Sequence, residues 1–526
     1  MKHARLGSWL RIVGLPLALV LLTAAALGCY YETNDDVAIT LLLRGRSAAA
    51  PVGDLHLYFH GWAALLAGLY ARWPAAPWYG LLLYGLLTLA LMLLFAVLDR
   101  LLRPHLGGVG RAGVLGWFYL AAGLEHVLWF NYMRVPLLLA GAALLFAAQR
   151  LNERRRWPLA LALLSLLAAW AIRPSAALLG ALVAAPAAYW LAGRRASRLL
   201  LLAALLFGAG TALLTAARSP EAARYRRLDV LKSNFSDYQL SRPRPRTAAD
   251  SLGVRAVQEW VLGDSVLVDE ALFARALPVE AAAFWQHTAP AKLRAGLPQF
   301  GRDYFLVLLL NLALLAWGLG QPGPGAWAWR LYLLAVPAGL LALLVLLKLP
   351  PRLALPILTI FTVANAAGVL GRAGRPVPGR YLLLTLLLAS GLYAYKTAHR
   401  VGVLRAEQAR NAGVMHALVR QAAGRTVVAA GLETHFKSLS PFVQYDGNGP
   451  GRWLLLTGWP TLDPSQPRLR QHLAGTRDQA RALGRLLPRA DVYAWWPAPG
   501  PLTRFLRRYG AARRWPAPAG PRDKNL

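Results

Sequence analysis

The chain has 526 residues, of which 57% are hydrophobic and 16% are charged, and its formal net charge is +34. Its apolar residues fall in runs of about 17 to 22, the length that crosses a bilayer, which excludes an ordinary soluble domain. Much of the arginine lies in short loops between these runs, so positive-inside topology explains the charge better than nucleic-acid binding does. The single cysteine excludes an internal disulfide framework and a cysteine-based metal site. The composition therefore predicts a polytopic membrane protein with no nucleic-acid partner.

The first apolar run covers residues 9–29, which as a helix is long enough to cross a bilayer core of about 30 Å. Lys2, Arg5 and Arg11 lie at or before its beginning, and basic residues mark the cytoplasmic side of a span. We therefore expect a cytoplasmic amino terminus, with the residues after Cys29 outside.

Three acidic residues, Glu32, Asp35 and Asp36, follow this run directly. Charges at the rim of a helix bundle are costly unless they are solvated, paired or bound to a ligand. The three carboxylates are either a hydrated anchor that stops the helix from sliding inward or part of a functional site, and this segment alone leaves both open.

Residues 55–70 form either a short span or a helix at the membrane interface. Their His, Trp and Tyr content suits the interface, where amphipathic rings are stable. A span here would also place Arg100, Arg103 and Arg111 outside, against the positive-inside rule. We therefore expect an interfacial segment.

Ten further spans then alternate across the membrane, which gives about eleven transmembrane helices in all. The ten are residues 81–98, 114–132, 135–148, 159–172, 176–191, 199–217, 305–319, 331–347, 353–370 and 382–395. The third and the last of these are short and would need tilt or extension. The short outer turns then carry only Arg134, Arg173, Lys348 and Arg352, whereas the inner loops carry Arg100, Arg103, Arg111, Arg150, Arg154, Arg155, Arg156, Arg194, Arg195, Arg198, Arg330, Arg372, Arg375 and Arg380.

This topology predicts a transmembrane module of residues 1–396, with outer loops 30–77 and 218–303, and an extracytoplasmic domain of residues 397–526. In the larger loop we expect short helices at 254–262, 270–277 and 280–288. In the domain, residues 426–430, 453–457 and 491–496 have the pattern of buried strands, with a helix at 467–487. The predicted fold class is an all-α polytopic membrane bundle with a small α/β carboxy-terminal domain.

Ionisable residues of both signs gather at the outer ends of these spans. They are Asp35, Asp36, Glu125, His126, Arg134, Arg173, Lys348 and Arg352. Carboxylates facing cations at one membrane surface fit chemistry on an anionic lipid head group. The carboxylate would accept a proton or hold a divalent cation, while arginine and lysine would offset charge on a leaving phosphate.

Each of these residues also has a structural alternative. A buried ion pair with Arg134 would account for Glu125 and His126. Capping of a helix end would account for Arg173, and contact with lipid head groups would account for the two cations near residue 350.

His56 and His60 are spaced i, i+4, so on a helix they could bind a metal from one face. Two ligands without a third also fit polar residues on an interfacial helix. We keep both as candidates for contact with the substrate, and the metal, including any divalent cation, is left open.

The segment Asn34-Asp35-Asp36 opens an outer loop after a first span, and an interfacial stretch, further spans and an outer domain follow it. This layout resembles the GT-C superfamily of integral-membrane glycosyltransferases. Thr33 to Asp36, with Gly61, Leu69-Tyr70 and Pro77-Trp78-Tyr79, is similar to a bacterial group of such proteins associated with surface glycans.

The resemblance implies an inverting transfer of a sugar from a polyprenyl-phosphate carrier to a hydroxyl of a glycan, lipid or protein acceptor. Asp35 or Asp36 would be the catalytic base, and Arg173, with one or more of the other outer cations, would hold the donor phosphate. The carboxy-terminal domain has no Trp-Trp-Asp signature, which argues against the oligosaccharyltransferase branch.

Three other readings stay open. A transporter or flippase of an anionic lipid or sugar usually shows two related halves, and no internal repeat is evident here. A surface-polysaccharide ligase or polymerase can share the layout, and a scaffold without activity is the remaining alternative. The arginine-rich, alanine-rich composition is typical of bacteria with GC-rich genomes, so we expect the bacterial cytoplasmic membrane as the location.

Overall fold

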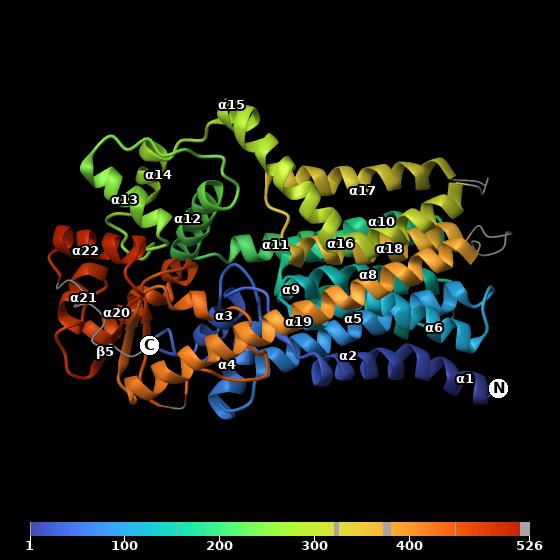
Figure 1. Ribbon diagram of the computed structural model, residues 1–526, viewed down its shortest axis with the longest axis horizontal. Coiled ribbons are helices and arrows are strands. Elements are labelled where there is room, and N and C mark those ends of the chain that lie inside the picture. The colour runs from blue at the N-terminus through green and yellow to red at the C-terminus, as the bar shows by residue number, and fades with distance from the viewer. Residues whose placement is uncertain (1, 154, 320–325, 372–379, 448, 516–526) are drawn as a thin grey trace. The chain divides into compact units, whose positions relative to one another are not determined.

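The computed structural model describes residues 2–153, 155–319, 326–371, 380–447 and 449–515 (Figure 1). The chain is mostly helical, and it divides into two compact units. The helical unit comprises Met1–Glu32, Gly80–Ala216 and Lys292–Arg405, and the mixed unit comprises Thr33–Tyr79, Ala217–Ala291 and Ala406–Leu526. Arg154, Arg372 and Arg375 of the predicted inner loops lie outside the described residues.

Long apolar helices build the helical unit. Their bounds are α1 Lys2–Trp9, α2 Leu15–Ala26, α5 Trp78–Leu102, α6 Gly108–Phe118, α7 Leu124–Leu128, α8 Arg134–Arg150, α9 Trp157–Ile172, α10 Pro174–Ala192, α11 Arg195–Ala216, α16 Ala289–Leu319, α17 Ala326–Leu346, α18 Pro351–Leu370 and α19 Arg380–Ala422. Single π-helical turns join α1 to α2 and α6 to α7. The domain boundary expected at residue 396 falls inside α19, which continues unbroken past it.

Seven stretches of helix within the described residues are long and apolar enough to cross a membrane, by length and composition. They are Leu6–Ala26, Trp78–Leu102, Pro174–Ala192, Arg195–Ala216, Ala281–Leu319, Ala326–Leu346 and Pro351–Leu370. The other four expected spans lie in α6 with α7, in α8, in α9 and in α19. The one expected at 114–132 ends early, because the helix stops at Leu128 and strand β2 (Trp129–Phe130) follows.

Helix α8 lies at the centre of this unit, since every residue from Arg134 to Ala148 is buried. Its closest partner is α10. A Cβ atom on Gly180 of α10 would lie only 2.1 Å from the carbonyl oxygen of Leu137 in α8, so glycine is required at this crossing. Small residues thus let two central helices pack backbone against backbone.

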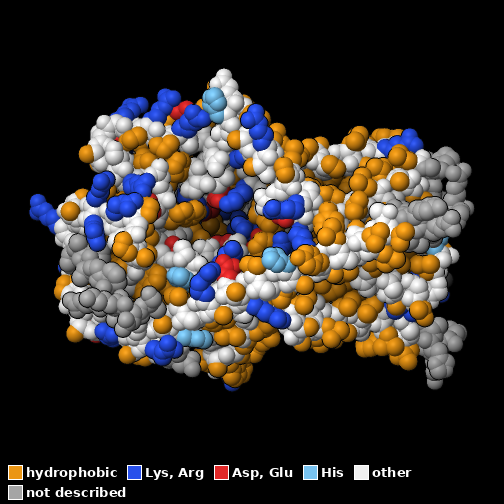
Figure 2. Space-filling view, viewed as in Figure 1, with side chains coloured by type: hydrophobic (Ala, Val, Ile, Leu, Met, Phe, Trp, Pro, Cys, Tyr) orange, Lys and Arg blue, Asp and Glu red, His pale blue; other side chains and the backbone are white. Residues whose placement is uncertain are grey.

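The outer surface of the helical unit is strongly apolar, and Figure 2 shows hydrophobic side chains covering much of it. On α11, for example, Leu201, Leu205 and Leu213 are all exposed. Contiguous apolar surface on this scale is unfavourable in water and favourable against lipid, which fits a membrane-embedded bundle.

The mixed unit contains shorter helices and a three-stranded sheet. Its elements are α3 Asp35–Leu43, α4 Trp62–Arg72, α12 Pro220–Ser236, α13 Ala248–Gln258, α14 Glu270–Ala276, α15 Ala281–Ala283, β3 Thr426–Ala429, β4 Trp453–Leu455, α20 Ser465–Ala474, α21 Gln479–Leu486, β5 Val492–Trp495 and α22 Pro501–Arg513. All three strands are parallel, in the order β4-β3-β5. The sheet and helices α13, α14 and α20 to α22 share one hydrophobic core.

The three predicted strands are confirmed, with ends that differ by at most two residues. The helix expected at 467–487 is wrong as a single element. Gly475 adopts a left-handed conformation (φ +67°) that ends α20, and the Asp478 side chain then caps α21 by accepting a hydrogen bond from the Arg481 N–H.

The segment expected at the membrane interface is helical only in α4, which has 11 residues. At 1.5 Å per residue such a helix is about 16 Å long, well short of a bilayer core of about 30 Å. This length argues against a span at 55–70.

Candidate functional site

The carboxyl edge of the three-stranded sheet is formed by the loops that follow its parallel strands. From the central strand β3 the chain moves to β4 on one side, and later to β5 on the other. In open parallel sheets, ligands bind outside the carboxyl ends of the strands where the strand order reverses. Here the loops that leave β3 and β4 carry Glu433 and Trp459.

Asp35 is held at this edge. Its carboxylate accepts hydrogen bonds from the Trp459 indole N–H at 2.9 Å and from the Thr33 hydroxyl at 3.0 Å. The side chain is partly exposed, and it lies in the first turn of α3, where the helix dipole favours a negative charge. Both donors are neutral, so they orient the carboxylate without cancelling its charge.

Asp36 has a different environment, although it is the next residue. It is 0% exposed, and the Tyr79 hydroxyl donates a hydrogen bond to its carboxylate at 2.8 Å. The Tyr79 N–H in turn donates to the buried Tyr70 hydroxyl at 3.0 Å, and burial raises the pKa of Tyr70 to about 12. Asp36 is therefore part of the core that fixes the start of α3, and a substrate cannot reach it without rearrangement.

A second carboxylate, Glu433, lies in the loop after β3. The Thr457 hydroxyl donates to it at 2.7 Å and accepts from the Gly431 N–H at 2.7 Å. Burial raises the pKa of Glu433. Thr457 is two positions before Trp459, so one short loop orients both Glu433 and Asp35.

His56 and His60 do not lie on one helix face, because residues 55–60 are not helical and His56 has a positive φ of 60°. The helical i, i+4 spacing that either alternative for this pair assumed is therefore wrong. His56 instead pairs with Asp54 at 3.0 Å, and this hydrogen bond raises the pKa of His56 and lowers that of Asp54. Within the described ranges, no three His, Cys, Asp or Glu residues form a group that could hold a metal ion.

The helical unit contains a buried ionic group. It brings together Glu32 and three of the predicted site residues, Arg134, His126 and Arg352. Strands β1 (Tyr30–Tyr31) and β2 pair in parallel and place Glu32 beside Arg134, at 2.7 Å. The Arg134 side chain is 0% exposed and that of Glu32 is 3% exposed. His126 contacts Arg134 at 3.2 Å, and Arg352 lies 3.6 Å from Glu32. Arg134 is thus neutralised and enclosed, which does not suit direct contact with a donor phosphate.

The remaining expected residues occupy separate positions in the same unit. Glu125 pairs at 2.9 Å with Arg400, whose guanidinium also stacks over the Trp129 ring at 5.0 Å. Arg173 joins α9 to α10 in extended backbone, and Lys348 is exposed in the connection from α17 to α18.

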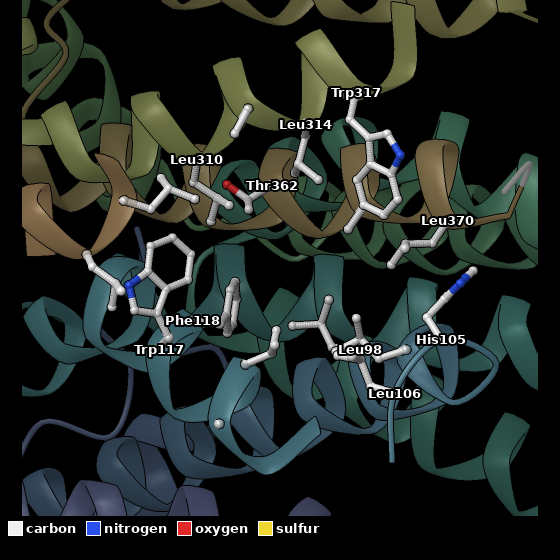
Figure 3. Close-up of a pocket in the computed structure, with 17 residues that line it drawn as sticks. Leu98, His105, Leu106, Trp117, Phe118, Leu310, Leu314, Trp317, Thr362 and Leu370 are labelled. Carbon is white, nitrogen blue, oxygen red and sulfur yellow. The ribbon is translucent and has the colours of Figure 1, made fainter. Parts of the chain in front are cut away.

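An apolar cavity of about 330 Å³ lies between α5, α6, α16, α18 and α19 (Figure 3). Side chains such as Leu98, Phe118, Leu314 and Trp317 line it, and Thr362 is the hydroxyl residue in its wall. A cavity with this lining suits a hydrocarbon chain rather than a polar ligand.

Glu433 and Trp459 are residues of this candidate site that sequence reasoning missed. A signal for both was present, because Gly431 and Gly458 follow predicted strands and both adopt a positive φ (+74° and +89°). Glycine at such a position marks a tight loop at a strand end.

Comparison with known proteins assigns no family to this arrangement. No protein-family model matches the chain, and no curated protein matches it. The chemistry of the site must therefore follow from its own side chains.

Proposed function

We propose that the chain is a membrane glycosyltransferase of GT-C type, with Asp35 as the general base. One observation carries this proposal: a partly exposed carboxylate, oriented by two neutral donors, stands at the carboxyl edge of a parallel sheet. An accessible, oriented carboxylate can accept a proton from a hydroxyl.

In the proposed reaction, Asp35 takes the proton of the acceptor hydroxyl while the acceptor oxygen attacks the anomeric carbon of the donor sugar. The bond from that carbon to the phosphate oxygen breaks, and polyprenyl phosphate leaves with the electron pair. Attack from the side opposite the leaving group inverts the anomeric configuration. Asp36 takes no part in proton transfer and instead positions the first turn of α3 through Tyr79.

The leaving phosphate needs a cation that a ligand can reach. Arg134 is excluded from this role by its complete burial, whereas Lys348 is exposed and Arg352 is partly exposed. We therefore keep Lys348 and Arg352, together with Arg173, as candidates for phosphate contact.

The proposal places the helical unit in the bacterial cytoplasmic membrane, with the amino terminus inside and the carboxyl terminus outside. Reporter fusions at the carboxyl terminus and in the loop near Arg244 test this topology without interrupting α19. Periplasmic alkaline phosphatase activity at both positions is expected, and cytoplasmic fluorescence from a fused green fluorescent protein at either would overturn it.

The transport alternative has one observation in its favour. Asn311 of α16 donates to Thr362 of α18 at 2.7 Å, and Asn365 donates to Asn311 at 2.7 Å, so a buried polar group lies between two apolar helices. Polar groups at such depth mark substrate pathways in many transporters.

A single experiment separates the two functions. The purified chain, reconstituted in liposomes, is given polyprenyl-phosphate sugars labelled in the sugar, with crude envelope extract as acceptor. A transferase releases polyprenyl phosphate and moves label to the acceptor, whereas a transporter moves intact donor across the bilayer. Movement without cleavage of the donor would favour transport. If the label is neither transferred nor moved, the scaffold alternative remains.

A further inference from the structure

A groove of about 400 Å³ runs between α13 and α22 in the mixed unit. These helices lie side by side, as Figure 1 and their contacts agree. Ser251 and Arg255 line the groove from α13, and Arg504, Phe505 and Arg508 line it from α22. Three arginines therefore line one small concavity.

The two helices that carry the groove are packed into the core of the unit. Phe505 of α22 and Val254 and Val257 of α13 are buried in the same hydrophobic cluster. The lining positions on each helix recur at i, i+3, i+4 and i+7, so each helix presents one continuous face. The packing beneath them thus fixes the helix positions from which the three exposed arginines extend.

The charge in the groove is poorly compensated. Helix α22 has no acidic residue, and Arg504 and Arg508 lie one turn apart, where like charges repel. Arg513 of the same helix pairs with Asp264 and Asp478, whereas neither of the two groove arginines has an ion-pair partner among the described residues.

The third groove arginine is only partly neutralised. Arg255 pairs with Glu259 at 2.7 Å, so one carboxylate lies next to the groove. Three guanidinium groups against this single carboxylate leave a net positive site.

We propose that this groove binds a phosphate group. The planar guanidinium fork matches two phosphate oxygens at once, and Arg504 also lies in the first turns of the 13-residue helix α22, whose amino-terminal end favours an anion. Leu252 and Pro501 in the lining give the uncharged remainder of a ligand an apolar surface. The site is independent of the transferase reaction, because it uses none of the residues assigned to proton transfer.

The test uses the full chain in neutral detergent micelles at low ionic strength, with two probes. Inorganic phosphate and short-chain phosphatidylglycerol are titrated separately, and binding is followed by calorimetry. Replacing both arginines in Arg504→Gln/Arg508→Gln is expected to weaken binding at least about tenfold, because two charged hydrogen-bond donors to the phosphate are lost. Tighter binding of the lipid probe identifies a head group as the source of the phosphate, and tighter binding of the inorganic ion identifies a soluble phosphate ligand.

Two matched variants keep the test specific. Arg507→Gln removes the same charge from the same helix outside the groove lining, and it should change affinity by less than about twofold. Ser251→Phe keeps all three arginines but fills the groove, and it should abolish binding. The proposal would be overturned if Arg507→Gln lost as much affinity as the double variant, or if Ser251→Phe bound the probes fully. It would also be overturned if the unmodified chain bound neither probe.

Discussion

Two carboxylates that are three positions apart in the chain have opposite environments, each within its own unit. Glu32 in the helical unit is enclosed and faces the cations Arg134 and Arg352. Asp35 in the mixed unit is partly exposed and faces the neutral donors Thr33 and Trp459. A carboxylate whose charge is cancelled inside a bundle stabilises a structure, whereas one that is oriented but not neutralised is available for chemistry.

The largest effect is expected when the cation beside Glu32 is removed. Arg134→Ala leaves a buried carboxylate without its main partner, and this costs about 3–5 kcal/mol. We expect loss of folded protein, measured as the monodisperse fraction in size-exclusion chromatography of a fluorescent fusion.

The matched control for that variant is the double change Glu32→Gln with Arg134→Met. It removes both charges together, so most of the folded yield should return. A double variant as unstable as Arg134→Ala would show that the ion pair is not the reason for the loss.

The next largest effect is expected at the buried aspartate. Tyr79→Phe removes the hydroxyl that donates to Asp36 and should cost about 1–3 kcal/mol, because the carboxylate then loses a buried partner. Thermal unfolding of the purified chain measures this loss. Unchanged unfolding would mean that Asp36 does not depend on Tyr79.

A smaller change in stability, with a clear change in activity, is expected at Trp459. In Trp459→Phe the ring can still pack against Tyr58, whose centroid is 5.6 Å away, but the N–H donor to Asp35 is lost. We expect about 1 kcal/mol of destabilisation and roughly a tenfold slower transfer per folded molecule. If Trp459→Phe and the unmodified chain transfer sugar at the same rate, Trp459 has no role in the reaction.

The smallest effect concerns the pair of Asp54 and His56. The pKa of His56 is raised on folding, so its contribution is complete below the unfolded pKa of about 6.5 and is lost as the pH rises through the folded pKa. The pKa of Asp54 is lowered, so its contribution is present above about pH 4 and is lost as the pH falls further. The pair is half exposed, so its effect is about 0.5 kcal/mol or less.

This contribution is measured as the difference in free energy of unfolding between the unmodified chain and His56→Gln, at pH 5.5 and at pH 8. The difference between the two proteins should be larger at pH 5.5. A difference that is larger at pH 8 would contradict the prediction that protonated His56 stabilises the fold.

Local patterns predicted the elements of this fold well and their contacts poorly. The strands at β3, β4 and β5 follow from short apolar runs with turn residues at their ends, and these signals are local. The single helix expected at 467–487 failed because Gly475 ends α20, a local signal that was present but was outweighed by the apolar pattern.

The partners of the two aspartates lie much further away in sequence. Tyr79 is 43 positions from Asp36, and Trp459 is 424 positions from Asp35. Nothing local to Asn34-Asp35-Asp36 indicates which carboxylate is enclosed, because that depends on distant rings. The acidic segment could thus be identified as a candidate from its position, while the choice between Asp35 and Asp36 required the fold.

The most direct test of the central claim is the transfer rate per folded molecule of Asp35→Asn compared with that of the unmodified chain. Asparagine keeps the shape and the hydrogen-bond acceptor but cannot take a proton, so thermal unfolding should shift little while sugar transfer falls about 100-fold or more. A folded Asp35→Asn protein that transfers sugar at the unmodified rate would contradict the assignment of Asp35 as the base.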